Sequence, residues 1–230
     1  MNLVASPNAP VDRESRTEQA YRELRQRILD NELPAGTSML EQEVAELLGM
    51  SRTPVREALI LLAKEGLVEV RPRQGMRVLP VSADDMADIY QVLTALEAEA
   101  AGDIARHGLP KRRIRALRDA VRAMDEALDR DDLLAWAAAD NEFHRLLMDS
   151  SRNPRLRALV HQFWDQGHRV RMLTLRLRPK PIMSNRDHLA LVEAIERRDA
   201  EAARSIHREH RIQAGQMLVG LLRQRRLAEL

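Results

Sequence analysis

The sequence predicts a mainly α protein with two parts, an N-terminal winged helix-turn-helix and a C-terminal antiparallel helical bundle. Three observations support this fold class. Apolar residues recur at helical spacing through most of the chain. Two short extended runs occur close together, between residues 67 and 81. Beyond Ser82 the pattern is helical throughout and is interrupted only by short breaks.

The composition excludes several classes of protein. The chain has 230 residues, of which 44% are hydrophobic, and this is enough to build a core in each of two parts. No apolar run is long enough to span a membrane. The first ten residues lack the basic and apolar blocks of a signal peptide, and we expect a disordered tail at 1–15. Because cysteine is absent, disulfides and thiolate chemistry are excluded, and we expect a cytoplasmic location.

Charge is informative only through its distribution. The formal net charge is +2, which does not by itself indicate a nucleic-acid partner. Nearly all of the basic residues are arginine, which suits phosphate and guanine contacts but also follows from a GC-rich genome. Between Ser51 and Arg77, however, basic residues outnumber acidic ones by six to three.

Three helices are predicted before residue 65. The first ends at the turn 31–36. The second spans about 41–48 and stops at Gly49, a natural left-handed C-terminal residue. The third begins at Ser51 or Thr53, either of which can cap it. Its apolar residues have the spacing of one buried face: Val55, Ala58, Leu59 and Leu62.

A hairpin follows these helices. Extended runs are predicted at 67–70 and 76–81, and the five residues 71–75 between them contain turn formers. Helix, short helix, helix and hairpin is the order of elements in a winged helix-turn-helix. We therefore assign residues 16–81 to a DNA-binding domain.

The remaining residues, 82–230, are predicted to form one helical domain for ligand binding and dimerisation. Short connections between helices favour an antiparallel bundle. The six predicted helices are Ser82 or Asp84 to about 107, 111–129, 131–149, 154–178, 184–198 and 200–227.

Arginines gather on the two elements that would meet DNA. Arg52 and Arg56 are four residues apart, so they project from one side of the third helix near its N-terminus. A recognition helix reads the major groove with its first turns, where arginine can bind O6 and N7 of guanine. Arg71 and Arg73, beside Gly75, suit phosphate or minor-groove contact. The alternative is a solvated face of a protein-interaction domain.

The run from Ser51 to Leu59, Ser-Arg-Thr-Pro-Val-Arg-Glu-Ala-Leu, resembles the GntR family of bacterial regulators, as do 40–45 and 62–68. The resemblance implies a dimer that binds a pseudo-palindromic operator. Members often carry an arginine where this chain has Gln42, which leaves the operator sequence open. The candidate DNA-contacting residues are Arg52, Thr53, Arg56, Ser51, Gln42, Arg71, Arg73 and Gly75.

A metal site is predicted in the helical domain. Asp140 and His144 are four residues apart on one helix and can face one point. His188 and His210 each lie 11 residues from the break at Asp199, so they can meet across an antiparallel hairpin. One carboxylate and three imidazoles suit zinc, nickel or manganese.

Other readings of these residues stay open. A histidine in a bundle is more often a hydrogen-bonded core or surface residue than a ligand. Asp140 could instead be a surface charge or the partner of Arg145 or Arg169. The alternative ligands are His161 and His168, seven residues apart, and His207, one turn before His210.

The second domain resembles the all-helical effector (FCD) domain of FadR-type GntR regulators. Its marks are Asp140-x-x-Phe-His144, Asn153-Pro154-x-Leu156 and Asp187-His188. The resemblance implies a divalent metal, with zinc preferred, that is bound by the four predicted ligands and helps to hold a small organic acid.

One position departs from this pattern. Members commonly carry an arginine for the effector's carboxylate a few residues before a Leu-Glu pair, but this chain has Leu93 there. Either Arg169, Arg171 or Arg176 replaces that arginine, or the effector is not a simple carboxylate.

These features together predict a ligand-responsive transcriptional regulator, by default a repressor, and not an enzyme. One alternative is a DNA-binding regulator with only a structural metal and no effector. Another is a metal-dependent hydrolase, although Glu142 would point away from the metal face.

Overall fold

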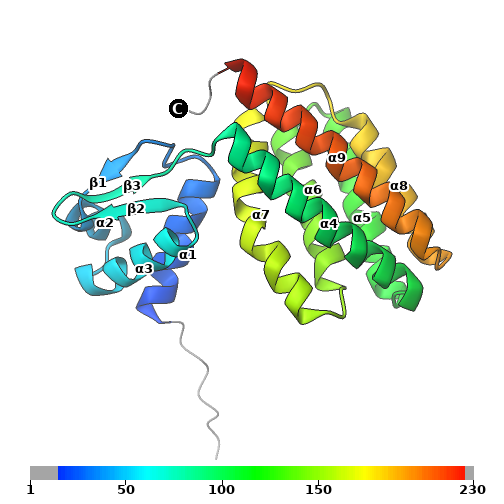
Figure 1. Ribbon diagram of the computed structural model, residues 1–230, viewed down its shortest axis with the longest axis horizontal. Coiled ribbons are helices and arrows are strands. Elements are labelled where there is room, and N and C mark those ends of the chain that lie inside the picture. Colours follow the sequence, from blue (N-terminus) through cyan, green and yellow to red (C-terminus); the bar gives the residue numbers. More distant parts are fainter. Residues whose placement is uncertain (1–14, 226–230) are drawn as a thin grey trace, which may run out of the picture. The chain divides into compact units, whose positions relative to one another are not determined.

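The computed structural model describes residues 15–225 (Figure 1). The predicted tail at 1–15, apart from Ser15, lies outside the described residues, as does the end of the helix predicted at 200–227. Residue contacts divide the chain into two units, one comprising the residues up to Ile28 and Thr37–Leu79, the other comprising Leu29–Gly36 and the residues from Pro80 onward. Within the described range, no helix is long and apolar enough to cross a membrane.

The first unit has the predicted winged helix-turn-helix order. Its core is formed by the apolar faces of three helices, including the stripe of Val55, Ala58, Leu59 and Leu62, all buried. Gly49 ends the second helix with φ 62° and ψ 34°, the predicted left-handed stop. The elements are α1 (Arg16–Leu29), β1 (Ser38–Met39), α2 (Glu41–Leu48), α3 (Arg52–Lys64), β2 (Val68–Arg71) and β3 (Gly75–Val78).

The sheet of this unit is antiparallel, with strand order β1-β3-β2. Arg71 pairs with Gly75, so the hairpin loop is three residues long and not the predicted five. Gly75 has φ +80°, and a Cβ there would overlap the carbonyl oxygen of Met39 and lie 2.6 Å from Leu40 Cα. Only glycine lets the hairpin approach the chain before α2 this closely.

The second unit is the predicted helical bundle. Helices α4 and α9 pack along each other, α5 packs on α6, and α8 packs on α9 (Figure 1). Their facing sides form one buried core that includes Leu93, Trp136, Phe143 and Leu218. The helices are α4 (Ala83–His107), α5 (Lys111–Asp129), α6 (Leu133–Asp149), α7 (Pro154–Thr174), α8 (Ile182–Glu196) and α9 (Ala200–Arg225).

Local chemistry explains where these helices begin. Ser82 Oγ accepts a hydrogen bond from Asp85 N at 3.0 Å and caps α4. Asn153 caps α7 in the same way, with Pro154 in the first turn. Helix α6 begins at Leu133, two residues later than predicted, because Asp131 has φ 58° and cannot continue a right-handed helix.

Candidate metal centre and DNA-contacting surface

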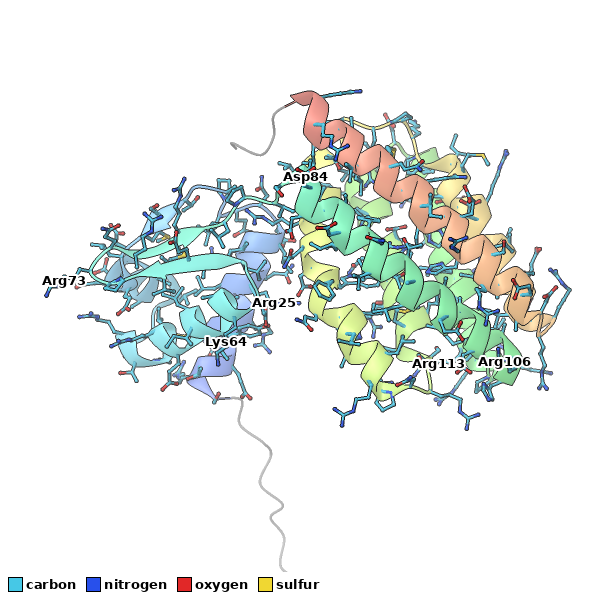
Figure 2. All side chains as sticks on the ribbon, in the orientation of Figure 1. Arg25, Lys64, Arg73, Asp84, Arg106 and Arg113 are labelled. Carbon is cyan, nitrogen blue, oxygen red and sulfur yellow. The ribbon has the colours of Figure 1, made fainter. Side chains whose placement is uncertain are left out.

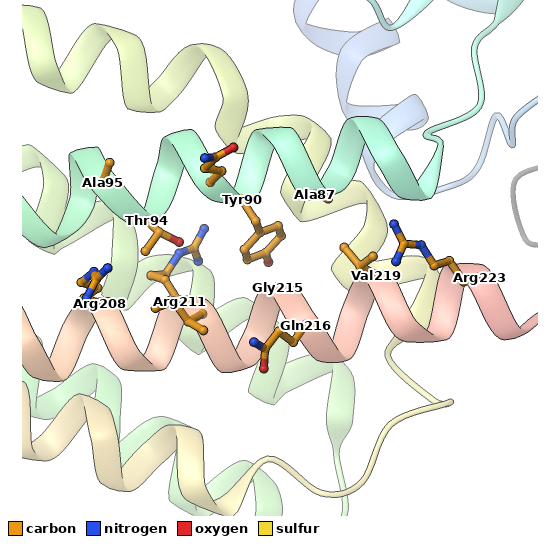
Figure 3. Close-up of a pocket in the computed structure, with 12 residues that line it drawn as sticks. Ala87, Tyr90, Thr94, Ala95, Arg208, Arg211, Gly215, Gln216, Val219 and Arg223 are labelled. Atoms are coloured by element: carbon orange, nitrogen blue, oxygen red, sulfur yellow. The ribbon is translucent and has the colours of Figure 1, made fainter.

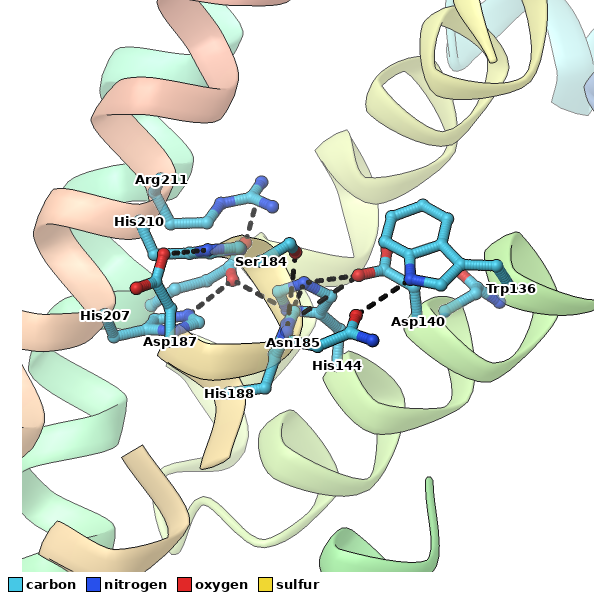
Figure 4. Close-up of polar contacts among 12 residues, drawn as sticks. Trp136, Asp140, His144, Ser184, Asn185, Asp187, His188, His207, His210 and Arg211 are labelled. Atoms are coloured by element: carbon cyan, nitrogen blue, oxygen red, sulfur yellow. Dashed lines mark hydrogen bonds and ion pairs between the residues drawn. The ribbon is translucent and has the colours of Figure 1, made fainter. Parts of the chain in front are cut away.

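Three helices bring the four predicted metal ligands together in the bundle (Figure 4). Asp140 and His144 come from α6, His188 from α8 and His210 from α9. The Nε2 atoms of His144 and His188 are 3.2 Å apart. Asp140 Oδ1 lies 3.8 Å from the first of these atoms and 3.7 Å from the second. All four side chains are buried.

These separations fit ligand atoms around a single divalent ion. Zinc binds imidazole nitrogen at about 2.0–2.1 Å with tetrahedral geometry, which places neighbouring ligand atoms roughly 3.3 Å apart. The ring centroids of His188 and His210 are 4.6 Å apart, and ligand nitrogens of His144, His188 and His210 all lie within 4.8 Å of one another. The ion would therefore be held by Asp140, His144, His188 and His210.

The electrostatics also favour ligation. Burial, followed by the neighbouring histidines, lowers the pKa of His144 and of His188 well below the ordinary value. Both rings are therefore neutral at pH 7 and offer a lone pair to a metal. The second ring nitrogen of His188 lies 3.5 Å from Ser184 Oγ, and Nδ1 of His210 lies 3.3 Å from Asp187 Oδ2, which orients the two rings.

A buried acid, Glu97 of α4, lies beside this cluster and was not predicted from the sequence. Its Oε2 is 3.0 Å from His207 Nε2, and its Oε1 is 3.2 Å from a terminal nitrogen of Arg211. Burial opposes its ionisation, but Arg211 and His207 still lower the pKa of Glu97. Glu97, His144 and His207 form a second group with metal-ligand spacing, so the structure leaves His207 as an alternative ligand.

The other residues considered as alternative ligands or partners lie outside the metal-ligand cluster. His161 is exposed and 3.5 Å from Asp149, and neither it nor His168 belongs to a metal-ligand group among the described residues. Arg145 pairs with Glu142 at 2.6 Å and with Asp149, so it is not the partner of Asp140. Glu142 is thus held on the outside of α6, away from the cluster.

A cavity of about 500 Å³ opens beside the metal-ligand cluster. Arg171, one of the three predicted effector arginines, lines it. Arg169 is buried and Arg176 is exposed, and neither is among the described residues that line the cavity. The cavity wall includes Tyr90, Trp136, Asp140, His144, Arg171, Arg178, Ser184, Asp187, His210 and Arg211.

Arg178 and Arg211 in this wall were not predicted. Arg211 reaches from α9 toward α4, where its guanidinium carbon lies 4.8 Å from the ring centroid of Tyr90 (Figure 3). Gly215 leaves room for that ring, because a Cβ there would lie 2.8 Å from it. The sequence of α9 does contain a signal for Arg211, because this residue continues the buried stripe of His207 and His210.

In the first unit, the predicted DNA-contacting side chains are accessible. The side chains of Arg52 and Arg56 are 68% and 71% exposed. Their guanidinium groups lie 3.5 and 3.9 Å from the carboxylate of Glu41, which orients both without burying them. Ser51 occupies the N-cap of α3 with extended backbone, although its side chain makes no capping bond.

The start of α3 and the hairpin share one surface. A hollow of about 410 Å³ is lined by Glu41, Gln42, Arg52, Arg56, Arg73 and Gly75, among others. Arg73 projects outward at the hairpin tip (Figure 2). Arg71 is exposed and pairs with Glu69 at 2.8 Å. The structure thus brings most of the predicted DNA-contacting residues to one face of the unit.

Comparison with known protein families matches both parts of the chain. Residues 16–78 match the model of bacterial regulatory proteins of the gntR family. Residues 88–213 match the FCD domain model. The two matches cover the winged unit and most of the bundle.

Individual relatives agree with these models. A protein of Agrobacterium vitis, described as an HTH-type transcriptional regulator in the TAR-I ttuE-ttuC' intergenic region, is 42% identical over 140 residues, 60% of this chain and 82% of that protein. An HTH-type regulator of Streptomyces ambofaciens is 34% identical over 83% of this chain and 79% of its own length. The HTH-type transcriptional repressor RspR of Escherichia coli is 28% identical over 89% of this chain and 87% of its own length.

Among solved structures, E. coli McbR/YncC has a TM-score of 0.79 over 91% of this chain and 99% of its own, at 23% identity, and thereby supports the fold. The relatives named here are transcriptional regulators and not enzymes. The chain belongs to the GntR family of bacterial transcriptional regulators and carries an FCD domain.

Proposed function

We propose that this regulator binds a pseudo-palindromic operator as a homodimer in the cytoplasm, and that a small metabolite bound at a divalent metal in the helical unit controls this binding. The proposed direction of regulation is repression of transcription, which the metabolite relieves. A relative named as a repressor, RspR of E. coli, supports it.

The observation that supports the sensor most is the position of the metal-ligand cluster at a cavity wall. Asp140, His144 and His210 line a space of about 500 Å³, which is large enough for a small organic molecule. A purely structural metal is usually closed off by its protein ligands. Access from a cavity therefore favours an ion that also binds an effector.

In this proposal, the bound metal would supply a localised positive charge for an oxygen of the effector. The chain's own residues hold the ion and position its ligands. Asp140 and the three histidines hold the ion, while Ser184 and Asp187 orient two of the rings. Arg171 and Arg211 lie in the same wall and favour an anionic effector.

The proposed DNA contacts are made by the exposed face of the winged unit. Arg52, Thr53 and Arg56 would enter the major groove, and Arg71 and Arg73 would contact the backbone or the minor groove. Gln42 lines the same hollow as Arg52 and Arg56, and Ser51 is the N-cap of α3. An effector changes operator binding only by its difference in affinity between the two arrangements of the dimer.

Operator fluorescence anisotropy on the full-length protein tests the proposal, with the operator taken from selection on random duplexes. The titration is run with zinc-loaded protein, with chelator-treated protein, and with each in the presence of a panel of organic acids. We expect an acid to weaken operator binding by roughly 5–150-fold only when zinc is present. Zinc binding without any effect of an acid would leave a structural metal and refute the sensor.

A further inference from the structure

The cavity beside the metal-ligand cluster has an excess of positive charge. Its described lining includes five cationic side chains and only two carboxylates, those of Asp140 and Asp187. Asp140 belongs to the metal-ligand cluster, and Asp187 contacts His210. A bound divalent ion would add further positive charge to the same space.

Two of the cations, Arg171 and Arg178, have no carboxylate of the described residues within ion-pair distance. The side chain of Arg171 is 7% exposed, and no described carboxylate lies within ion-pair distance of it. Its terminal nitrogen Nη2 is buried without a hydrogen-bond partner, as is Nε of Arg178. By contrast, Arg211 has an acidic partner, because its Nη2 lies 3.2 Å from Glu97 Oε1.

These two guanidinium groups are held in place by aromatic rings. Arg171 Cζ lies 5.4 Å from the ring centroid of Trp164, and Arg178 Cζ lies 5.3 Å from that of Trp136. A terminal nitrogen of Arg178 also donates to the backbone oxygen of Arg171 at 3.5 Å. The structure therefore holds two like charges in one cavity wall, where Asp140 acts on Arg178 and Glu97 acts on Arg171 without a direct ion pair.

A buried charge without a partner is costly, and two fixed together cost more unless an anion joins them. The planar guanidinium fork matches the geometry of a carboxylate or a phosphate. An acid group already engaged by the metal has few lone pairs left for this second set of donors. These free donors therefore favour a ligand with a second acid group.

We propose that the cavity takes a small dianionic organic acid, with one carboxylate at the metal and a second acid group on Arg171 and Arg178. This inference rests on the proposed function, because it names the chemical class of that effector. It assigns the recognition of the second acid group to arginines from α7 and from the connection after it.

Calorimetric titration of full-length, zinc-loaded protein tests this inference with matched probes. The dianionic probes are malonate, succinate and glutarate, and phosphoglycolate, which carries up to three charges, is a fourth probe with two acid groups. Their partners, the monoamides of the three diacids and glycolate, each lack one acid group. We expect at least one dianionic probe to bind about tenfold or more tightly than its partner, because charge-assisted hydrogen bonds are lost with the second acid group.

Two variants assign that preference to the arginines. In Arg171→Gln and Arg178→Gln, the preference should fall to about onefold. It should persist in Arg155→Gln, which removes an exposed arginine from the first turn of the same α7 helix. Retained zinc stoichiometry and operator binding show that each variant is folded, and Arg171→Lys gives a second test that keeps the charge.

The inference is overturned if zinc binds but no dianionic probe is preferred, if none binds, or if the preference survives in both glutamine variants. Failure of the proposed function looks different. In that case zinc does not bind to the unmodified protein, or the bound acid has no effect on operator affinity. A preference for dianionic probes on zinc-free protein would retain the arginine site and remove only the metal.

Discussion

His144 and His188 approach within 3.2 Å between their Nε2 atoms although 44 residues separate them in the chain. Helices α6 and α8 place them there, and burial keeps both imidazoles neutral. Two neutral rings that face one point together with a carboxylate have the donor types and spacing that a divalent metal needs.

The first prediction concerns this pair. His188→Ala should lower zinc stoichiometry in purified protein, while operator binding of the metal-free form remains within about twofold of the unmodified protein. Elemental analysis and anisotropy measure the two quantities. His161→Ala is the matched control, because this histidine is exposed and lies outside the cluster. Full zinc content in His188→Ala would remove His188 from the site.

The second prediction concerns the recognition helix. Arg52→Ala and Arg56→Ala should each weaken specific operator binding by roughly 1–3 kcal/mol, because each removes a contact to a base or a phosphate. Lys64→Ala is the control, since it removes an exposed charge from the opposite end of the same helix. Unchanged affinity in both arginine variants would contradict the assignment of α3 to DNA.

The third prediction is a pH dependence in the metal-free protein. Burial lowers the pKa of His144, His188 and His207, so below about pH 6.5 the unfolded chain takes up protons that the folded chain does not. The free energy of unfolding should therefore be greatest above pH 6.5 and decrease as the pH falls. The slope per histidine is about 1.4 kcal/mol per pH unit.

Denaturant unfolding between pH 7.5 and pH 5.5 measures that slope. His188→Gln removes one of the titrating groups, so its slope should be smaller by about one such step. A free energy of unfolding that does not change over this range would show that these imidazoles take up protons as readily in the folded chain as in the unfolded one.

The fourth prediction concerns the buried acid of α4. Glu97→Gln should reduce the free energy of unfolding by about 3–5 kcal/mol, because it leaves the charge of Arg211 buried without a counter-ion. Glu99→Gln should cost no more than about 1 kcal/mol, because Glu99 is exposed and pairs with Arg204 near the surface. Equal losses in the two variants would mean that Arg211 finds another partner.

The fold was predictable wherever the apolar periodicity agrees with the residues that cap or end helices. Gly49, Ser82 and Asn153 end or begin helices by local chemistry, which the sequence displays directly. The two-residue strand β1 was not predicted, because Ser38 and Met39 are too few to show an alternating pattern. Their pairing with Arg77 and Met76 depends on contacts distant in sequence.

The site was predictable only in part for the same reason. Asp140 and His144 share a helix face, and His188 and His210 lie at equal distances from a turn, so local geometry brings each pair together. Glu97 is 110 residues from His207, and only packing of α4 on α9 joins them. A carboxylate in the buried stripe of α4 was nevertheless a signal that a partner was needed.

The backbone contact at Gly75 has a consequence for how operators can vary. With no side chain at this position, the hairpin lies directly against the chain that leads into α2, and the pairing of β1 with β3 joins the two. The tip arginine Arg73 and the first turn of α3 line one hollow of this unit. If these residues contact an operator as proposed, this packing sets the offset between a groove contact and a wing contact, and new operators are reached by exchanging side chains at that spacing.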